Sequence, residues 1–344
     1  MRHYASRYPR NGKIAILCEG DLAGYEADIL ESWTALHPEL GLVDVWPCGT
    51  KTAIYGLADA IGRATRVCVI EDRDHRKPEF AAKQCRRNKK NRESRGVQIG
   101  FWKTWKRNEI ENYLIEPSIV IPVFADAFGT SEDNVKECLQ SVLTTTSDDQ
   151  ALQHTLSEFR SVFPNGESEV GGVPRKECRP RWEGGALQSP SQEKVSELLA
   201  AVLTDSVKKL AEERHPKVDD FLKGFDDKCK KWRKVKLEDN EWRTDWAGKE
   251  VLLWLRIKMA AEFGWPDFPS SGRVKVEWEA LNQSDSGELD RRIERVLQPR
   301  LAKALLHLLN EDKEDDSALV SEWRDLIDDL RGSSSPDDPT EQAE

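Results

Sequence analysis

The fold is decided by Lys13-Ile-Ala-Ile-Leu-Cys18, a run that continues directly into Glu19-Gly20-Asp21. A second run of the same kind, Arg66-Val-Cys-Val-Ile70, continues into Glu71-Asp72-Arg73-Asp74. Both runs are almost entirely apolar, which is typical of strands that are buried on both faces of a parallel sheet. Each of the two predicted strands therefore ends in a group of acidic residues.

The residues around these two strands alternate between helix and strand patterns. Apolar spacing predicts helices at about 25–37 and 51–62, with a strand at 41–47 between them. A strand-helix-strand-helix-strand order over so short a length predicts a parallel sheet with right-handed crossovers. Residues 97–101 add a fourth strand. We therefore expect an α/β fold, in which a small parallel sheet flanked by helices is followed by a mainly helical C-terminal region.

The chain of 344 residues is long enough for two domains. Apolar residues recur at helical spacing in 195–210 and 289–308, so the part after the sheet is predicted to be helical. The predicted organisation is a sheet domain at 1–125, a helical domain at 126–331 with a loop at 164–192, and a disordered acidic tail at 332–344.

Composition predicts a cytoplasmic protein without a membrane partner. Hydrophobic residues make up 38% of the chain and charged residues 33%. No apolar run reaches the length of about eighteen residues that a membrane span needs, and the N-terminal residues lack the apolar core of a signal peptide. The seven cysteines contain no CxxC pair, which favours free thiols over disulfides or a zinc site.

Positive charge is concentrated in one segment, although the formal net charge is −10. Between Arg73 and Arg107 there are thirteen lysines or arginines and only three acids, whereas the chain from Glu311 onward is strongly acidic. Because few positions of 73–96 are apolar, we expect the segment 73–107 to form a basic loop, mobile over 73–96, that binds nucleic acid. The predicted phosphate contacts are Arg86, Arg87, Lys89, Lys90, Arg92, Lys103, Lys106 and Arg107.

Three carboxylates are expected to meet at one edge of the sheet. Glu19 follows the first strand, and Asp72 and Asp74 follow the third. Active-site acids of open parallel sheets lie where strands end, and alternate residues of an extended chain point the same way. These acids therefore predict a site for Mg²⁺ or Mn²⁺, with Asp72 and Asp74 as the main ligands. Such an ion supports phosphodiester hydrolysis, with Glu19 as a further ligand or as the general base.

The order of these motifs resembles a known domain. Glu19-Gly20 after the first strand, Gly49 after the second and Asp72-x-Asp74 after the third resemble the TOPRIM domain. The segment Glu109-Ile-Glu-Asn-Tyr-Leu114 resembles the "EIENYL" element of TOPRIM nucleases of the overcoming-lysogenization-defect (OLD) type. The later segment Trp246-Ala-Gly-Lys249 resembles the "GK" element of the same group.

The resemblance implies a metal-dependent endonuclease. It makes Glu111 a ligand for a second ion, and it makes Lys249 a catalytic cation that neutralises charge on the phosphate. Chains like this one, without an ATPase motif, resemble the TOPRIM effector subunits of ATPase-linked anti-phage systems such as PARIS. A partner ATPase of the ABC or AAA type and a toxic role in antiviral defence are therefore expected. The roles of four further acids stay open: Asp21, Glu26, Asp28 and Glu109.

Two other interpretations fit the same acids. The pair Asp72-x-Asp74 could belong to a magnesium-dependent phosphatase of the haloacid-dehalogenase-like type, although that family has the pair after its first strand. The chain could also be a catalytically silent regulatory subunit that acts through its partner. The sequence does not distinguish DNA from RNA, tRNA included, as the substrate, and it leaves a homodimer open.

Overall fold

The computed structural model describes most of the chain as two compact units. The described residues are 14–20, 25–162, 170, 172–183, 186–208, 217–264, 286–311 and 318–334. The sheet unit contains those that fall within Met1–Arg73, Pro78–Lys106 and Ala302–Glu344. The helical unit contains those that fall within Asp74–Lys77 and Arg107–Leu301.

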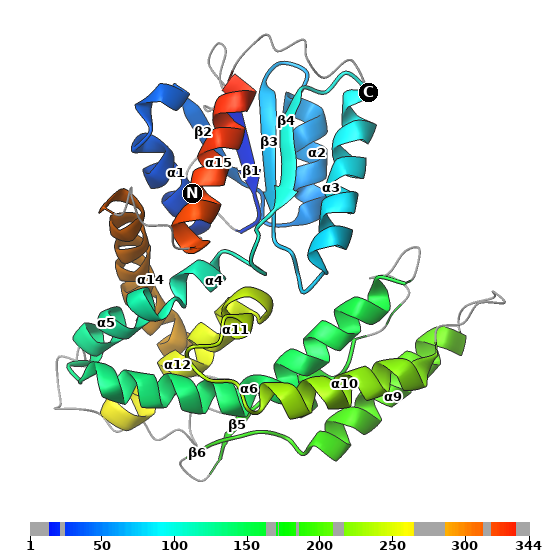
Figure 1. Ribbon diagram of the computed structural model, residues 1–344, viewed down its shortest axis with the longest axis vertical. Coiled ribbons are helices and arrows are strands. Elements are labelled where there is room, and N and C mark those ends of the chain that lie inside the picture. The colour runs from blue at the N-terminus through cyan, green and yellow to red at the C-terminus, as the bar shows by residue number, and fades with distance from the viewer. Residues whose placement is uncertain are drawn as a thin grey trace. The chain divides into compact units, whose positions relative to one another are not determined.

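The sheet unit is built on four parallel strands, which confirms the predicted α/β class (Figure 1). The strands are β1 (Ile14–Cys18), β2 (Val43–Pro47), β3 (Arg66–Glu71) and β4 (Ile99–Thr104), in the spatial order β2-β1-β3-β4. All five residues of β1 are buried, as expected for a strand with a neighbour on each side. In the register, Cys18 lies opposite Pro47 of β2 and Ile70 of β3, so these three strands end at the same edge.

One face of the sheet is covered by the helices α2 (Lys51–Ile61) and α3 (Pro78–Glu93). Ile54 of α2 and Cys85 of α3 belong to one buried cluster with Val69 of β3. The predicted mobile loop is therefore wrong over the residues of α3, which form a regular helix of four turns or more. Sequence patterning missed this helix because few of its residues are apolar.

The other face of the sheet is covered by α1 (Tyr25–Ala35), which the short 3₁₀ turn η2 (Pro38–Leu40) follows, and by α15 (Ala318–Ser334). Figure 1 shows α15, in red, lying across the strands. The indole of Trp323 packs edge-on against that of Trp33, with 4.8 Å between ring centroids, and its ring lies 5.4 Å from that of Trp105. A helix from the end of the chain therefore completes the core of this unit, and the boundary between the units differs from the predicted one at 125/126.

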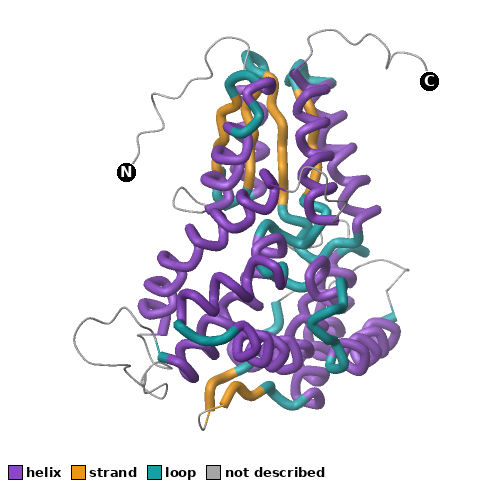
Figure 2. The backbone as a smooth tube through the Cα atoms, turned by 60° about the vertical axis from the view of Figure 1, so that its left-hand side comes forward, coloured by secondary structure: helices purple, strands orange, loops and turns teal. Residues whose placement is uncertain are grey.

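The helical unit contains most of the remaining chain, and Figure 2 shows that the described segments outside the sheet are mainly helices. Its helices are α4 (Glu111–Leu114), α5 (Pro117–Phe128), α6 (Glu132–Arg160), α8 (Arg175–Cys178), α9 (Gln192–Lys208), α10 (Val218–Trp232), α11 (Glu241–Asp245), α12 (Gly248–Phe263) and α14 (Ser286–Glu311) as far as Leu301. The long helix α6 packs against α5, α10 and α12. None of the described helices is long and apolar enough to cross a membrane.

Two predicted irregular segments are partly ordered. Within the predicted loop at 164–192 the structure describes α8 and a hairpin of β5 (Arg181–Glu183) and β6 (Ala186–Gln188). Helix α15 reaches Ser334, so the predicted disorder is wrong at 332–334, and the rest of the predicted tail, 335–344, lies outside the described residues. All seven cysteines are free thiols, as predicted.

Candidate functional site

Two of the predicted metal ligands meet at the carboxyl edge of the sheet. Glu19 follows β1 and Asp72 follows β3, and these strands are neighbours in the sheet. The Glu19 Oε1 atom accepts a hydrogen bond of 2.9 Å from the backbone N–H of Asp72. Both side chains are half-buried. The sheet thus brings the Glu19 carboxylate against the backbone of Asp72 at its rim.

The turns at this edge depend on two glycines with left-handed backbone. Gly20 has a φ of 96° and Gly49 a φ of 80°, and the Gly49 N–H donates a 2.6 Å hydrogen bond to the Gly20 carbonyl. Thr50 then caps α2 by accepting from the backbone N–H of Ala53, which makes Lys51 the first residue of the helix. The Lys51 ammonium lies 3.6 Å from Glu19 Oε1. Lys51 therefore starts the helix, as predicted, and it also adds a cation to the edge.

A third acid of this region is buried. Glu26, in the first turn of α1, accepts a 3.2 Å hydrogen bond from Trp105 Nε1. The combined field of the acids acts on the thiol of Cys18: burial raises its pKa well above the usual range, and Glu26, Asp72 and Glu19 raise it further. Three acidic side chains therefore lie near the end of β1, and such side chains favour a bound cation.

The carboxylates at this edge fit a magnesium ion that keeps part of its water shell. Within the described ranges, no three His, Cys, Asp or Glu side chains lie together as a complete metal cage. Mg²⁺ is usually held by one or two carboxylates, with water and substrate phosphate completing its octahedron. The pair formed by Glu19 and Asp72 meets that requirement, because both groups supply hard oxygen ligands.

The third predicted ligand, Asp74, lies in a turn that belongs to the helical unit. Strand β3 ends at Glu71, and Asp74 and His75 have φ values of 50° and 60°. The extended backbone expected from Asp72 to Asp74 is therefore wrong. The Asp74 carbonyl accepts a 3.0 Å hydrogen bond from Ser157 Oγ of α6, and the His75 N–H donates to Asn108 Oδ1. These contacts fix the turn against helical-unit residues.

The two motifs of the helical unit come together, although they lie far apart in the sequence. Lys249, in the first turn of α12, donates its backbone N–H to Glu109 Oε1 at 2.9 Å, and its ammonium lies 2.8 Å from Glu109 Oε2. Asn112 Nδ2 donates to the carbonyl of Trp246 at 2.9 Å. Glu111 is half-buried beside Glu109, and its Oε2 has no hydrogen-bond partner among the described residues. Glu109, whose role the sequence left open, is thus the acid that pairs with Lys249.

The close approach of these motifs depends on Gly248. A Cβ atom at this position would lie 2.6 Å from the backbone N of Asn112 and 2.7 Å from the carbonyl carbon of Glu111. We expect Gly248→Ala to lower the free energy of unfolding by about 1–3 kcal/mol, since neither backbone atom yields easily. Urea denaturation followed by circular dichroism measures the change.

The control is Gly224→Ala in α10, where the nearest atom to an added Cβ is Lys228 Nζ at 3.9 Å. This variant should raise the free energy of unfolding by about 0.5–1 kcal/mol. Equal stability of both variants would contradict this packing.

Burial controls the charge of Glu109. Its carboxyl group is 2% exposed, and burial followed by the charge of Glu111 raises its pKa from 4.5 to about 7, while Lys249 opposes the rise. The folded chain therefore keeps a proton that the unfolded chain loses between about pH 4.5 and pH 7. Stability should fall as pH rises through this window, by on the order of 2–3 kcal/mol.

The Glu109→Gln variant tests this pH dependence. Unfolding free energies measured from pH 4.5 to pH 8 should decline for the wild type and decline less for the variant, which has no proton to lose at this position. Lys249→Met should move the midpoint of the decline to higher pH, because the ammonium lowers the pKa of Glu109. Identical pH profiles for all three proteins would contradict the buried, protonated carboxyl.

The predicted phosphate contacts divide into buried, paired and exposed cations. Arg92 and Arg107 are buried at 7% and 2% exposure. The Arg92 guanidinium lies over the ring of Trp102 at 4.3 Å, and the Arg107 guanidinium pairs with Glu116. Because both guanidinium groups are buried and make contacts inside the protein, they are unsuited to phosphate binding.

The remaining predicted cations lie on β4, just after it, and on α3. Lys103 and Lys106 form ion pairs with Asp329 and Asp325 of α15. Lys89 donates to the carbonyl of Gly100. Only Arg86, Arg87 and Lys90 are exposed without such partners among the described residues. Trp102 and Trp105, which lie in the same basic segment, are 5% exposed and donate to Glu71 and Glu26, so neither ring is available to stack on a base.

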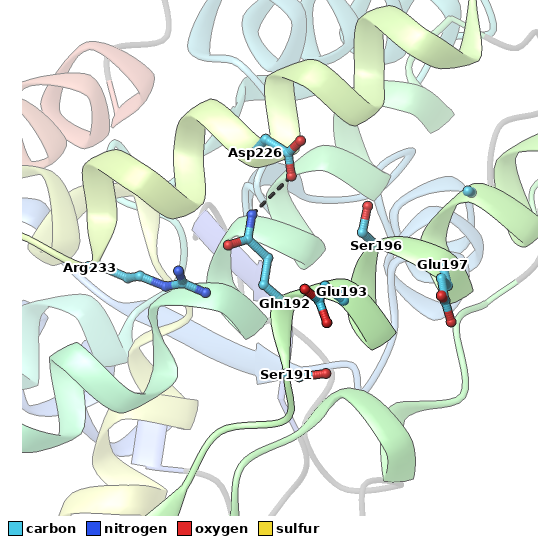
Figure 3. A pocket seen from close by; sticks show the side chains of 8 residues that line it. Ser191, Gln192, Glu193, Ser196, Glu197, Asp226 and Arg233 are labelled. Carbon is cyan, nitrogen blue, oxygen red and sulfur yellow. Dashed lines mark hydrogen bonds between the residues drawn. The ribbon is translucent and has the colours of Figure 1, made fainter.

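A groove of about 800 Å³ lies elsewhere in the helical unit, between α9 and α10 (Figure 3). Its lining includes the carboxylates of Glu193, Glu197 and Asp226, and Gln192 Nε2 donates to Asp226 Oδ1 at 3.0 Å. Arg233 also lines it, but its guanidinium is paired with Asp148. An acidic lining repels polyanions, and none of the predicted site residues contributes to it. The groove is therefore separate from the candidate site.

Comparisons of the chain with protein-family models, with curated proteins and with solved structures find no match.

Proposed function

We propose that this chain is a metal-dependent nuclease that hydrolyses phosphodiester bonds. The observation that carries the proposal is the approach of Glu19 to Asp72 at the carboxyl edge of a parallel sheet, where Glu19 Oε1 accepts a 2.9 Å hydrogen bond from the backbone N–H of Asp72. Ligands of open parallel sheets bind at this edge. The acidic side chains near Cys18 would attract a metal ion, and the adjacent ammonium of Lys51 would attract the phosphate bound to it.

Each residue at the edge has a separate role in the proposal. Glu19 and Asp72 would hold Mg²⁺ or Mn²⁺, which when bound polarises a phosphoryl oxygen and lowers the pKa of water. Lys51, 3.6 Å from Glu19, would contact a non-bridging phosphate oxygen. The buried carboxylate of Glu26 would keep the edge negative. The predicted roles of Asp74, Glu111 and Lys249 stay predictions, and all three belong to the helical unit.

A cleavage assay on three substrates tests the proposal. Purified protein is incubated with supercoiled plasmid, single-stranded DNA and total RNA that includes tRNA, in Mg²⁺, in Mn²⁺ or in EDTA. We expect cleavage of at least one substrate with metal and none with EDTA. Release of phosphate from a generic phosphomonoester without cleavage of any nucleic acid would instead support the phosphatase interpretation.

The resemblance to anti-phage effectors adds a partner to the proposal. In that case the isolated chain is silent, and nuclease activity appears when an ATPase partner from the same genetic neighbourhood is added with its trigger. Silence under all conditions, together with metal binding too weak to detect, would favour the regulatory subunit instead.

A further inference from the structure

The outward face of α3 carries a cluster of cations that form no ion pair with described residues, and one acid, Glu79, lies at the N-terminal end of the same face. Lys83, Arg86, Arg87 and Lys90 are all exposed, and none of them forms an ion pair or hydrogen bond with any described residue. At about 100° per residue, these four positions fall within a sector of about 100° on the helix surface. The opposite side of the helix, which includes Ala81 and Cys85, is buried against the sheet. The cations therefore form one stripe that faces solvent.

An exposed aromatic ring lies on the same stripe. Phe80 is 42% exposed, and it is one of four large hydrophobic side chains that are exposed among the described residues. Its position is about 20° around the helix from Arg87 and about 60° from Lys83. The stripe from Phe80 to Lys90 is about 15 Å long. Because this ring is exposed to solvent beside several cations, it does not contribute to the core of the sheet unit.

Exposed cations beside an exposed ring distinguish this stripe from the other basic residues nearby. Lys103 and Lys106 are already paired with carboxylates of α15, and Arg92 is buried under aromatic rings. Among the predicted phosphate contacts, the cations without a partner in the described residues thus all lie on α3, where a polyanion would gain contacts without displacing an internal carboxylate. Phosphates bind to such cations, and an exposed ring adjacent to them stacks on an unpaired base.

We propose that the stripe of Phe80, Lys83, Arg86, Arg87 and Lys90 on α3 is a binding surface for single-stranded nucleic acid. The cations contact successive phosphates, and Phe80 stacks on one base. Duplex DNA or RNA does not offer a free base face to Phe80, so single strands are preferred. The inference deepens the proposed nuclease function by assigning its substrate class, but binding at this stripe requires neither metal nor cleavage.

Binding in EDTA separates this inference from the nuclease activity. Fluorescence anisotropy with labelled oligonucleotides of about 20 nucleotides, as single-stranded DNA, single-stranded RNA and duplex DNA, gives the dissociation constant at several salt concentrations. The wild type should bind both single strands more tightly than the duplex. The triple variant Lys83→Ala/Arg87→Ala/Lys90→Ala should bind at least tenfold more weakly, and the slope of log K against log salt should be shallower by about 2.

The control triple variant Lys223→Ala/Lys230→Ala/Lys234→Ala removes the same charge from the exposed surface of α10 and its end, and it should bind as the wild type does. Phe80→Ala should weaken binding of single strands about tenfold and leave duplex binding unchanged, whereas Val162→Ala, at another exposed apolar position, should change neither. Equal loss in both triple variants, or a Phe80→Ala variant that binds single strands normally, overturns the inference. A protein that binds as expected but never cleaves overturns the proposed nuclease function instead.

Discussion

Replacement of Asp72 by asparagine is expected to lower the rate of metal-dependent cleavage by about 100- to 1,000-fold. The amide has the shape of the carboxylate but not its charge, so a divalent cation loses one of two anionic ligands at the edge of the sheet. Glu19→Gln should act in the same direction, since Glu19 accepts from the backbone of Asp72. Cleavage rates at saturating Mn²⁺ measure both effects.

The control for Asp72→Asn is Asp44→Asn. Asp44 lies opposite Ala15 in the sheet register, near the start of its strand rather than at the edge that carries the candidate site. A second readout is independent of catalysis, because a metal that binds only the folded state raises the melting temperature. The increase in melting temperature on adding Mn²⁺ should disappear in Asp72→Asn and persist in Asp44→Asn. Full cleavage by a folded Asp72→Asn protein would eliminate Asp72 from the site.

Replacement of Trp323 by alanine is expected to lower the stability of the sheet unit by about 3–5 kcal/mol. The side chain is 2% exposed, and its ring packs against Trp33 and Trp105, which come from two other elements of the same unit. Truncation removes the largest apolar side chain of α15 and leaves a cavity between the helices and the sheet. Calorimetry and urea denaturation measure the loss.

Trp323→Phe is the matched control, because it keeps an aromatic ring in the same place. Trp323→Phe should lower the stability of the sheet unit by less than half as much as Trp323→Ala does. If Trp323→Ala unfolds at the wild-type temperature, then α15 does not pack on the sheet as described. That outcome would also mean that Lys103 and Lys106 are available for phosphate binding, since their ion-pair partners lie on α15.

The strands of the sheet could be predicted from the sequence, because a fully buried parallel strand leaves a continuous apolar run. The same reasoning placed Glu19 and Asp72 near each other, since the ends of parallel strands meet at one edge. Helix α3 could not be predicted in this way. Its buried side includes Arg92, whose long side chain covers Trp102 as an apolar residue would, so the apolar periodicity is interrupted by a charge.

The candidate site in the helical unit was only half predictable. The sequence singled out Glu111 and Lys249, but the side chain that pairs with Lys249 is Glu109. That choice depends on the close approach of Gly248 to the backbone of Glu111 and Asn112, which is a property of packing rather than of spacing. The packing of α15 on the sheet could not be predicted either, because helical apolar spacing does not indicate against which element a helix packs.

The position of α15 has a consequence for synthesis of the protein. The sheet unit takes its strands from residues before Lys106 and its last covering helix from residues after Ala302. At 5–20 residues per second, a ribosome needs roughly 10–40 s to translate the segment between them. During that interval the nascent sheet leaves apolar side chains around Trp33 and Trp105 without their cover from α15, and these side chains are a target for holding chaperones. Premature termination before α15 should therefore yield insoluble polypeptide rather than a smaller folded protein.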